Sequence, residues 1–176
     1  MVFDKRIFIF LFTNGLLIQL MLLVNSGIPF VGLNLFLLGP VFILPPLYLR
    51  ADHFFITSIL CGLWIDAALP TPFGFFTFIN LIIGTLILLT RLRFRAEKNY
   101  HPCLLAHIAN AATFSLLTIA YSLGSNHLFD LILSSLIELS LSHLILMMIA
   151  PWFFNLQRVL FSIFDSKTEP ESLPFV

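Results

Sequence analysis

Six apolar segments, each close to the length needed to cross a lipid bilayer, follow one another along the chain. They cover about residues 7–24, 31–49, 54–69, 73–90, 103–123 and 128–150. A helix needs roughly 20 apolar residues to cross the hydrocarbon core. The chain is 59% hydrophobic and only 10% charged, with a mean hydropathy of +1.02, so its charges are too few to cover a water-facing globule. The pattern predicts an all-α integral membrane protein, a bundle of six transmembrane helices.

The basic residues predict which side of the membrane each end occupies. With six spans and a cytoplasmic N-terminus, all nine Lys and Arg lie in the cytoplasm and the outer loops hold none. Pro40, Pro45 and Pro46 in the second segment leave a re-entrant loop open as an alternative. That alternative would move the basic stretch 91–98 outside, against the positive-inside rule. We therefore expect a multi-pass membrane protein with both termini in the cytoplasm.

The sequence after the sixth segment allows two structures. Pro151 suits the first turn of a new helix. Apolar residues then recur at helical spacing, as in an amphipathic helix on the inner membrane surface: Trp152, Phe153, Leu156, Val159, Leu160 and Ile163. Alternatively, the sixth segment runs on through a kink. We expect residues 1–164 to form one transmembrane domain and the polar tail 165–176 to be disordered.

Asp66 is an ionisable residue at the outer end of the third segment, within the stretch GLWIDAALPTPFG. Ser58, Gly62 and Asp66 recur every four residues and so share one helix face. Small residues admit another helix closely, and we expect Ser58 and Gly62 to admit a helix of a partner protein. The first amides of the fourth segment have no partner within their own helix. We expect Asp66 to accept hydrogen bonds from them, with Gly74 allowing close approach. A proton or substrate site is the alternative for an acid in a span.

Glu138 lies near the middle of the sixth segment. Its helical face also carries Ser134, Ser135 and Ser142, which predicts a polar seam pointing into the bundle. Glu138 is either protonated and hydrogen-bonded to its neighbours or paired with a group on another helix. His107 on the fifth segment is a possible partner, although its depth near the inner end argues against contact. His143 points away from Glu138, toward a neighbouring helix or another subunit.

Two further groups of polar residues complete the candidate set. Thr77, Asn80 and Gly84 form a stripe of polar and small residues on the fourth segment, typical of helix contacts in membranes. The loop RLRFRAEKNYHP carries a basic cluster, which consists of Arg91, Arg93, Arg95 and Lys98. We expect this cluster to set the orientation and to touch anionic lipid headgroups. A docking site for a cytoplasmic partner is the alternative.

Motifs that would indicate an enzyme are missing from the sequence. There is no G-x-S-x-G, no H-E-x-x-H, no Walker loop and no pair of carboxylates at close spacing. The two cysteines, Cys61 and Cys103, have no second ligand at metal-binding spacing. We therefore expect no catalytic residues, no cofactor and no metal, and the formal net charge of zero points to no nucleic-acid partner.

The segment GLWIDAALPTPFGFFTFINLIIGTLILLTRLRFR resembles the core of MreD, the rod shape-determining membrane protein family of bacteria. Gly62, Asp66 and Gly74 match the family pattern of a Gly, an Asp four residues later, a short outer turn and a Gly that opens the next helix. The basic stretch after the fourth segment matches as well. So does a late step from proline to an aromatic residue and then a basic one, here Pro151, Trp152 and Arg158. Glu138 and the proline-rich second segment have no counterpart in that pattern.

The resemblance implies a non-enzymatic scaffold subunit of the machinery that builds the lateral cell wall and maintains rod shape. Its partner would be an MreC-like protein with a single span and a periplasmic domain. Through that partner it would connect to the cytoskeletal protein MreB and to a peptidoglycan glycosyltransferase and transpeptidase. The implied fold is similar to the six-helix substrate-binding subunits of energy-coupling-factor vitamin transporters.

Two other functions stay open. A vitamin-binding subunit would need polar and aromatic residues that converge on an outer pocket, and the outer loops offer no cation for an anionic vitamin. A lipid or precursor transporter would need Glu138 to relay protons. The sequence shows no converging ligand site, which favours the scaffold.

Overall fold

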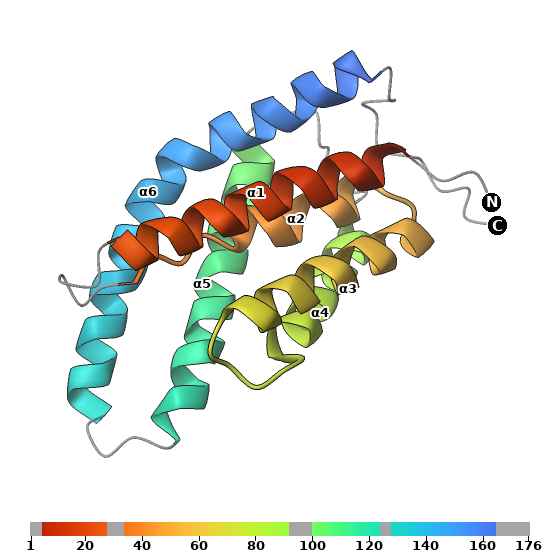
Figure 1. Ribbon diagram of the computed structural model, residues 1–176. Coiled ribbons are helices and arrows are strands. Elements are labelled where there is room, and N and C mark those ends of the chain that lie inside the picture. Colours follow the sequence, from red (N-terminus) through yellow and green to blue (C-terminus); the bar gives the residue numbers. More distant parts are fainter. Residues whose placement is uncertain (1–4, 28–33, 92–99, 124–127, 165–176) are drawn as a thin grey trace.

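The computed structural model describes residues 5–27, 34–91, 100–123 and 128–164, and these residues form six α-helices (Figure 1). The helices are α1 Lys5–Gly27, α2 Gly39–Tyr48, α3 Ala51–Ala68, α4 Phe75–Thr90, α5 Tyr100–Ser122 and α6 Leu128–Ile163. The predicted all-α class is confirmed for this part of the chain. The tail 165–176 and the basic residues Arg93, Arg95 and Lys98 lie outside the described residues, so the predictions made for them stay open.

Four of the described helices, α1, α3, α5 and α6, are long and apolar enough to cross a membrane. α2 and α4 are shorter apolar helices of 10 and 16 residues. The start of α1 and the end of α6 lie at the same end of the molecule (Figure 1). The connection between α3 and α4 lies away from that end (Figure 1).

The short helix α2 is the centre of the bundle. All ten of its residues are buried, and it contacts each of the other five helices. Figure 1 shows it enclosed behind α1 and beside α3 and α5. Its sequence, GPVFILPPLY, explains this position, because a helix that is apolar on all sides is stable only where other elements surround it.

Polar side chains from neighbouring helices satisfy the backbone groups that α2 leaves free. Pro45 has no N–H to donate to Val41 O, and Asn14 Nδ2 of α1 donates to that carbonyl instead (3.4 Å). At the other end, Arg6 Nη1 donates to Tyr48 O (3.0 Å). Positive charge at a helix C-terminus also complements the helix dipole.

Arg91 plays the same part as Arg6 at the end of α2. Its Nη1 donates to Leu49 O (3.0 Å), and its side chain is buried, with 7% of its surface exposed. Arg91 therefore points into the bundle, and the lipid contact expected of the basic cluster stays a prediction. The apolar sequence gave no sign that the carbonyls at the end of α2 would need a buried donor.

The sixth segment continues without a break through Pro151. α6 is one helix of 36 residues with Pro151 in its interior, so of the two structures left open the continuous one is observed. The apolar residues expected on one face of 151–164 divide between two environments, because Trp152, Val159 and Ile163 are exposed whereas Phe153 is buried. The buried face consists of Phe153, Phe154, Gln157 and Phe161. It packs on α1, where the rings of Phe161 and Phe10 lie 5.3 Å apart.

Candidate functional site

The side chain of Asp66, near the end of α3, binds the first turn of α4. Its Oδ1 accepts a hydrogen bond from Phe76 N (2.8 Å), and its Oδ2 accepts from Thr77 N (3.1 Å) and Thr77 Oγ1 (2.6 Å). The side chain is buried, with 4% exposed. The first amides of a helix have no acceptor within it, and the positive end of the dipole favours a carboxylate there. The contact expected between Asp66 and the next helix is therefore present.

Gly74 shapes the turn that leads into α4, in a way different from the one expected. It precedes the first helical residue with a φ of 94°, a left-handed conformation that L side chains rarely adopt. A Cβ added at Gly74 would have no described heavy atom within 4 Å. The turn therefore requires glycine for its backbone angle, whereas we had expected it to be required for close approach.

The stripes expected on the third and fourth segments face each other across the contact between α3 and α4. A Cβ at Gly62 would come within 2.5 Å of Thr77 Cα. Asn80 Nδ2 donates to Ser58 O (3.0 Å). One turn further on, a Cβ at Gly84 would come within 2.5 Å of the ring of Phe54. The two helices thus pack antiparallel along these residues.

This packing corrects the role expected for Ser58 and Gly62. Their small side chains were expected to admit a helix from a partner protein. Ser58 is 1% exposed and Gly62 is buried, both against α4 of the same chain. The place where another helix approaches closely is therefore filled by the chain itself.

Residues 34–38, just before α2, form no helix and are held inside the bundle by side chains. Five backbone N–H groups here donate to side chains of other helices. Asn34 N donates to Glu138 Oε1 (3.0 Å), Leu35 N to Asn25 Oδ1 (2.8 Å) and Phe36 N to Ser142 Oγ (2.9 Å). Leu37 N donates to Met21 Sδ (3.4 Å), and Gly39 N donates to Asn110 Oδ1 (3.0 Å). Asn110 Nδ2 also donates to Phe36 O, and Asn25 Nδ2 donates to Leu35 O. A non-helical backbone persists at membrane depth only where protein satisfies it in this way.

Glu138 belongs to this set of acceptors. Its Oε1 accepts hydrogen bonds from both the backbone N–H and the side-chain amide of Asn34. Ser142, on the same face of α6, is fully buried and binds Phe36 N. Of the polar seam expected on the sixth segment, Glu138 and Ser142 bind residues 34–36, whereas Ser134 is exposed and bonds within α6.

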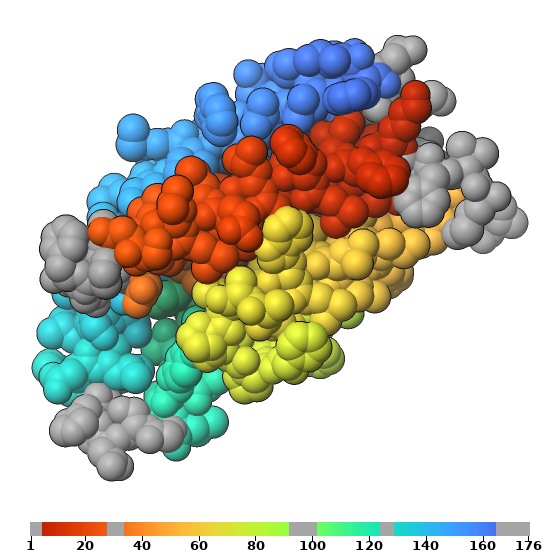
Figure 2. Space-filling view, in the orientation of Figure 1, coloured from red at the N-terminus to blue at the C-terminus, as the bar shows by residue number. Residues whose placement is uncertain are grey.

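A cavity of about 780 Å³ lies beside this non-helical segment. Its walls come from the C-terminal end of α1, residues 34–36, the connection after α3, the C-terminal half of α5 and the start of α6. Figure 2 shows a hollow between these elements, below the end of α1. Volumes of 300–1,000 Å³ are typical of sites for small molecules.

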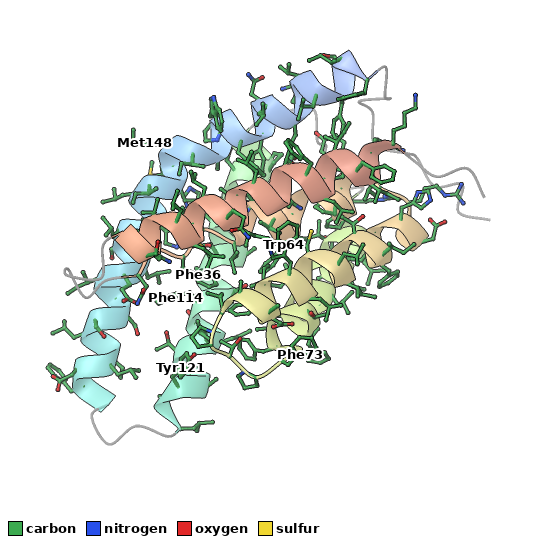
Figure 3. The ribbon with its side chains drawn as sticks, viewed as in Figure 1. Phe36, Trp64, Phe73, Phe114, Tyr121 and Met148 are labelled. Atoms are coloured by element: carbon green, nitrogen blue, oxygen red, sulfur yellow. The ribbon has the colours of Figure 1, made fainter. Side chains whose placement is uncertain are left out.

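The wall of the cavity combines aromatic and polar side chains. Phe36 and Phe114, whose rings lie 5.5 Å apart, and Tyr121 line it and are labelled in Figure 3. The polar lining residues are Asn25, Asn34, Thr71, Thr118, Tyr121, Ser134, Ser135 and Glu138. Residues far apart in the sequence thus meet around one cavity, which the sequence did not predict.

His107 on α5 and His143 on α6 contact each other. Their Nδ1 atoms lie 2.7 Å apart, and their rings stack with centroids 5.0 Å apart. A hydrogen bond between these two atoms requires that one Nδ1 carries a hydrogen and that the other does not. His143 was expected to face a neighbouring helix or another subunit, and it faces α5; its pairing with His107 was not predicted. Among the described residues, no group of three or more His, Cys, Asp or Glu side chains is placed to hold a metal ion.

Comparisons with protein-family models, with curated proteins and with solved structures found no match. The resemblance to MreD therefore rests on the residues quoted above.

Several polar residues that build this site were not among the candidates. Asn25 and Asn34 lie at segment ends, where an asparagine is ordinary. Asn14 and Gln157 meet across α1 and α6, with Gln157 Nε2 donating to Asn14 Oδ1 (3.4 Å). A signal was available for Asn14, since a buried amide in a span needs a partner, and Pro45 on the next segment leaves a carbonyl without one.

Proposed function

We propose that this chain is a non-enzymatic scaffold subunit of the bacterial machinery for lateral cell-wall synthesis, similar to MreD. The observation that carries the proposal is that Gly62, Asp66 and Gly74, the residues of the resemblance, serve one junction between α3 and α4. Both oxygens of Asp66 are engaged by α4. This supports a structural role for the motif over a proton or substrate site.

We propose further that the chain crosses the membrane six times with both ends in the cytoplasm. The second crossing would combine residues 34–38 with α2. Five non-helical residues reach up to about 17 Å, and ten helical residues add about 15 Å. Their sum is about the 30 Å thickness of the hydrocarbon core. The buried partners of residues 34–38 make such a crossing physically acceptable.

Reporter fusions test this topology. Fusions after Arg50, Lys98 and Lys167 should report cytoplasm, because the six-span arrangement places every Lys and Arg inside. Fusions at Thr71 and Ser125 should report the outer side. An outer signal at Lys98 would show that the second segment does not cross.

Co-purification tests the scaffold function. From mild detergent the protein should bring down an MreC-like single-span protein, and its depletion should make rod-shaped cells round. To map the contact, a photo-crosslinking amino acid is placed on exposed positions of three helices, at Phe12 of α1, Leu86 of α4 and Met148 of α6. The fully buried Phe42 is the matched negative control. If depletion leaves cell shape unchanged and no such partner is captured, the scaffold proposal is wrong.

A second candidate function is favoured by one observation, the cavity beside residues 34–36. A substrate-binding subunit of an energy-coupling-factor vitamin transporter would use such a pocket. It would associate with an ATPase module, and feeding the nutrient would cure its loss. Capture of an ATPase pair in place of the MreC-like protein would decide for this function.

A further inference from the structure

We propose that the cavity beside residues 34–36 is a binding site for an organic ammonium ion, a primary amine carried on an apolar body. The inference rests on the geometry of the cavity, and it holds whether or not the chain is a scaffold. Three observations carry it: the charge of the lining residues, the direction of their hydrogen bonds and the aromatic wall.

The only charged side chain among the described lining residues is Glu138, and none of them is Lys, Arg or His. Both hydrogen bonds from Asn34 go to Glu138 Oε1. The described residues supply no donor to Oε2, and the side chain is partly exposed at the cavity. A carboxylate or phosphate ligand would meet this acid with no cation to compensate it, whereas an ammonium ion complements it.

The hydroxyl groups of the wall also present acceptors to the cavity. Thr118 Oγ1 donates its hydrogen to Phe114 O, Tyr121 Oη donates to Pro70 O, and Ser134 Oγ donates to Leu131 O. Each hydroxyl has one hydrogen, so what remains for a ligand is the oxygen lone pairs.

The other polar groups of the wall are consistent with this reading. Asn25 uses both ends of its amide on Leu35. The described residues supply no hydrogen-bond partner to the hydroxyls of Thr71 and Ser135, which can donate or accept. The wall is therefore rich in acceptors, and it requires a ligand rich in donors.

The apolar part of the wall accounts for the body of the ligand. Phe36, Phe114 and Tyr121 provide aromatic faces, and Leu117 and Leu131 add aliphatic surface. Aromatic faces attract cations as well as apolar groups. An ammonium head on an aromatic body therefore satisfies the carboxylate, the lone pairs and the rings together.

Three probes with one body and different heads test the inference. Tryptamine, its alcohol analogue tryptophol and its acid analogue indole-3-propionate are titrated against the purified full-length protein in a neutral detergent. Affinity is measured by thermophoresis and thermal shift. Tryptamine should bind about tenfold more tightly than tryptophol, the gain of one charge-assisted hydrogen bond, and the acid should bind least. Equal affinity for the three heads, or tighter binding of the acid, would overturn the proposal.

Two variants and a control locate the site. Glu138→Gln keeps an acceptor for Asn34, so the fold should persist, and the preference for the amine should disappear. Ser135→Phe should fill the cavity and weaken all three probes while it leaves the carboxylate in place. Asp130→Asn removes an exposed carboxylate from the first turn of α6, outside the cavity lining, and should leave the affinities unchanged. An amine preference that survives Glu138→Gln and Ser135→Phe would show that the amine binds elsewhere. If Glu138→Gln does not fold, the wild-type comparison and Ser135→Phe still decide.

Discussion

Replacing Asp66 with leucine should lower the free energy of unfolding by about 3–5 kcal/mol. The substitution removes the acceptor of three hydrogen bonds, from Phe76 N, Thr77 N and Thr77 Oγ1. The hydroxyl of Thr77 can turn to another acceptor, but the two backbone amides at the start of α4 cannot. Each buried donor without a partner costs about 1–3 kcal/mol. Unfolding of the purified protein in detergent, together with its abundance in the membrane, measures the loss.

The conservative variant separates the charge from the hydrogen bonds. Asp66→Asn keeps an oxygen for Phe76 N, but its NH₂ group then faces the N–H of Thr77. We expect an intermediate loss of about 1–2 kcal/mol. Asp130→Leu is the control, because Asp130 is exposed and should change stability by about 0.5 kcal/mol or less. If both Asp66 variants were stable and abundant yet failed to support cell shape, Asp66 would act directly in function and its bonds to α4 would matter little.

The contact between α3 and α4 was predictable from the sequence because both partners are close along the chain. Helical spacing placed Ser58, Gly62 and Asp66 on one face, and a turn of a few residues brings the next helix back along it. An acid at the end of one helix then lies beside the free amides at the start of the next, and a hydrogen bond between them is expected. The left-handed backbone conformation of Gly74 was not predicted, because a glycine in a turn can serve either close approach or a positive φ.

The centre of the bundle was not predictable in the same way. The second segment looked like a proline-containing span, and the non-helical stretch 34–38 has no local signal that distinguishes it from a helix. Its partners come from α1, α5 and α6, through Asn25, Asn110, Ser142 and Glu138. Each of these residues lies at least ten positions away in sequence. Periodicity shows which face of a helix is polar, but it does not show which backbone that face will meet.

The cavity escaped prediction for a related reason. Its lining comes from five separate stretches of the chain, and most of its polar members are single residues in apolar surroundings. Helical spacing places Thr118 and Tyr121 on the same face of the fifth segment as His107. In the structure, residues of that face at different depths have different neighbours. His107 meets His143, whereas Thr118 and Tyr121 line the cavity near the end of α5.

Replacing Gly39 with alanine should destabilise the protein by about 3 kcal/mol, a large effect for a single methyl group. Gly39 opens α2 and faces α5. A Cβ there would overlap the backbone oxygen of Ala106 and come within 2.9 Å of Asn110 Cβ. The obstacle is a helix backbone, so no rotation of a side chain relieves it. Moving α2 away would also stretch the bond from Gly39 N to Asn110 Oδ1.

Gly15 and Gly27, both in α1, provide matched controls for Gly39, because an added Cβ would have different surroundings at each position. At Gly15 the added Cβ would come within 2.9 Å of the Trp64 ring, a side chain that is partly exposed and can shift, so we expect a loss of about 1 kcal/mol. At Gly27 it would meet no described atom within 4 Å, and alanine should cost nothing. Unfolding midpoints of the three variants in one detergent should therefore fall in the order Gly27→Ala, Gly15→Ala, Gly39→Ala. A Gly39→Ala protein as stable as Gly27→Ala would show that α2 and α5 do not pack this closely. That result would also contradict the hydrogen bond from Gly39 N to Asn110 Oδ1, which helps to hold the segment before α2.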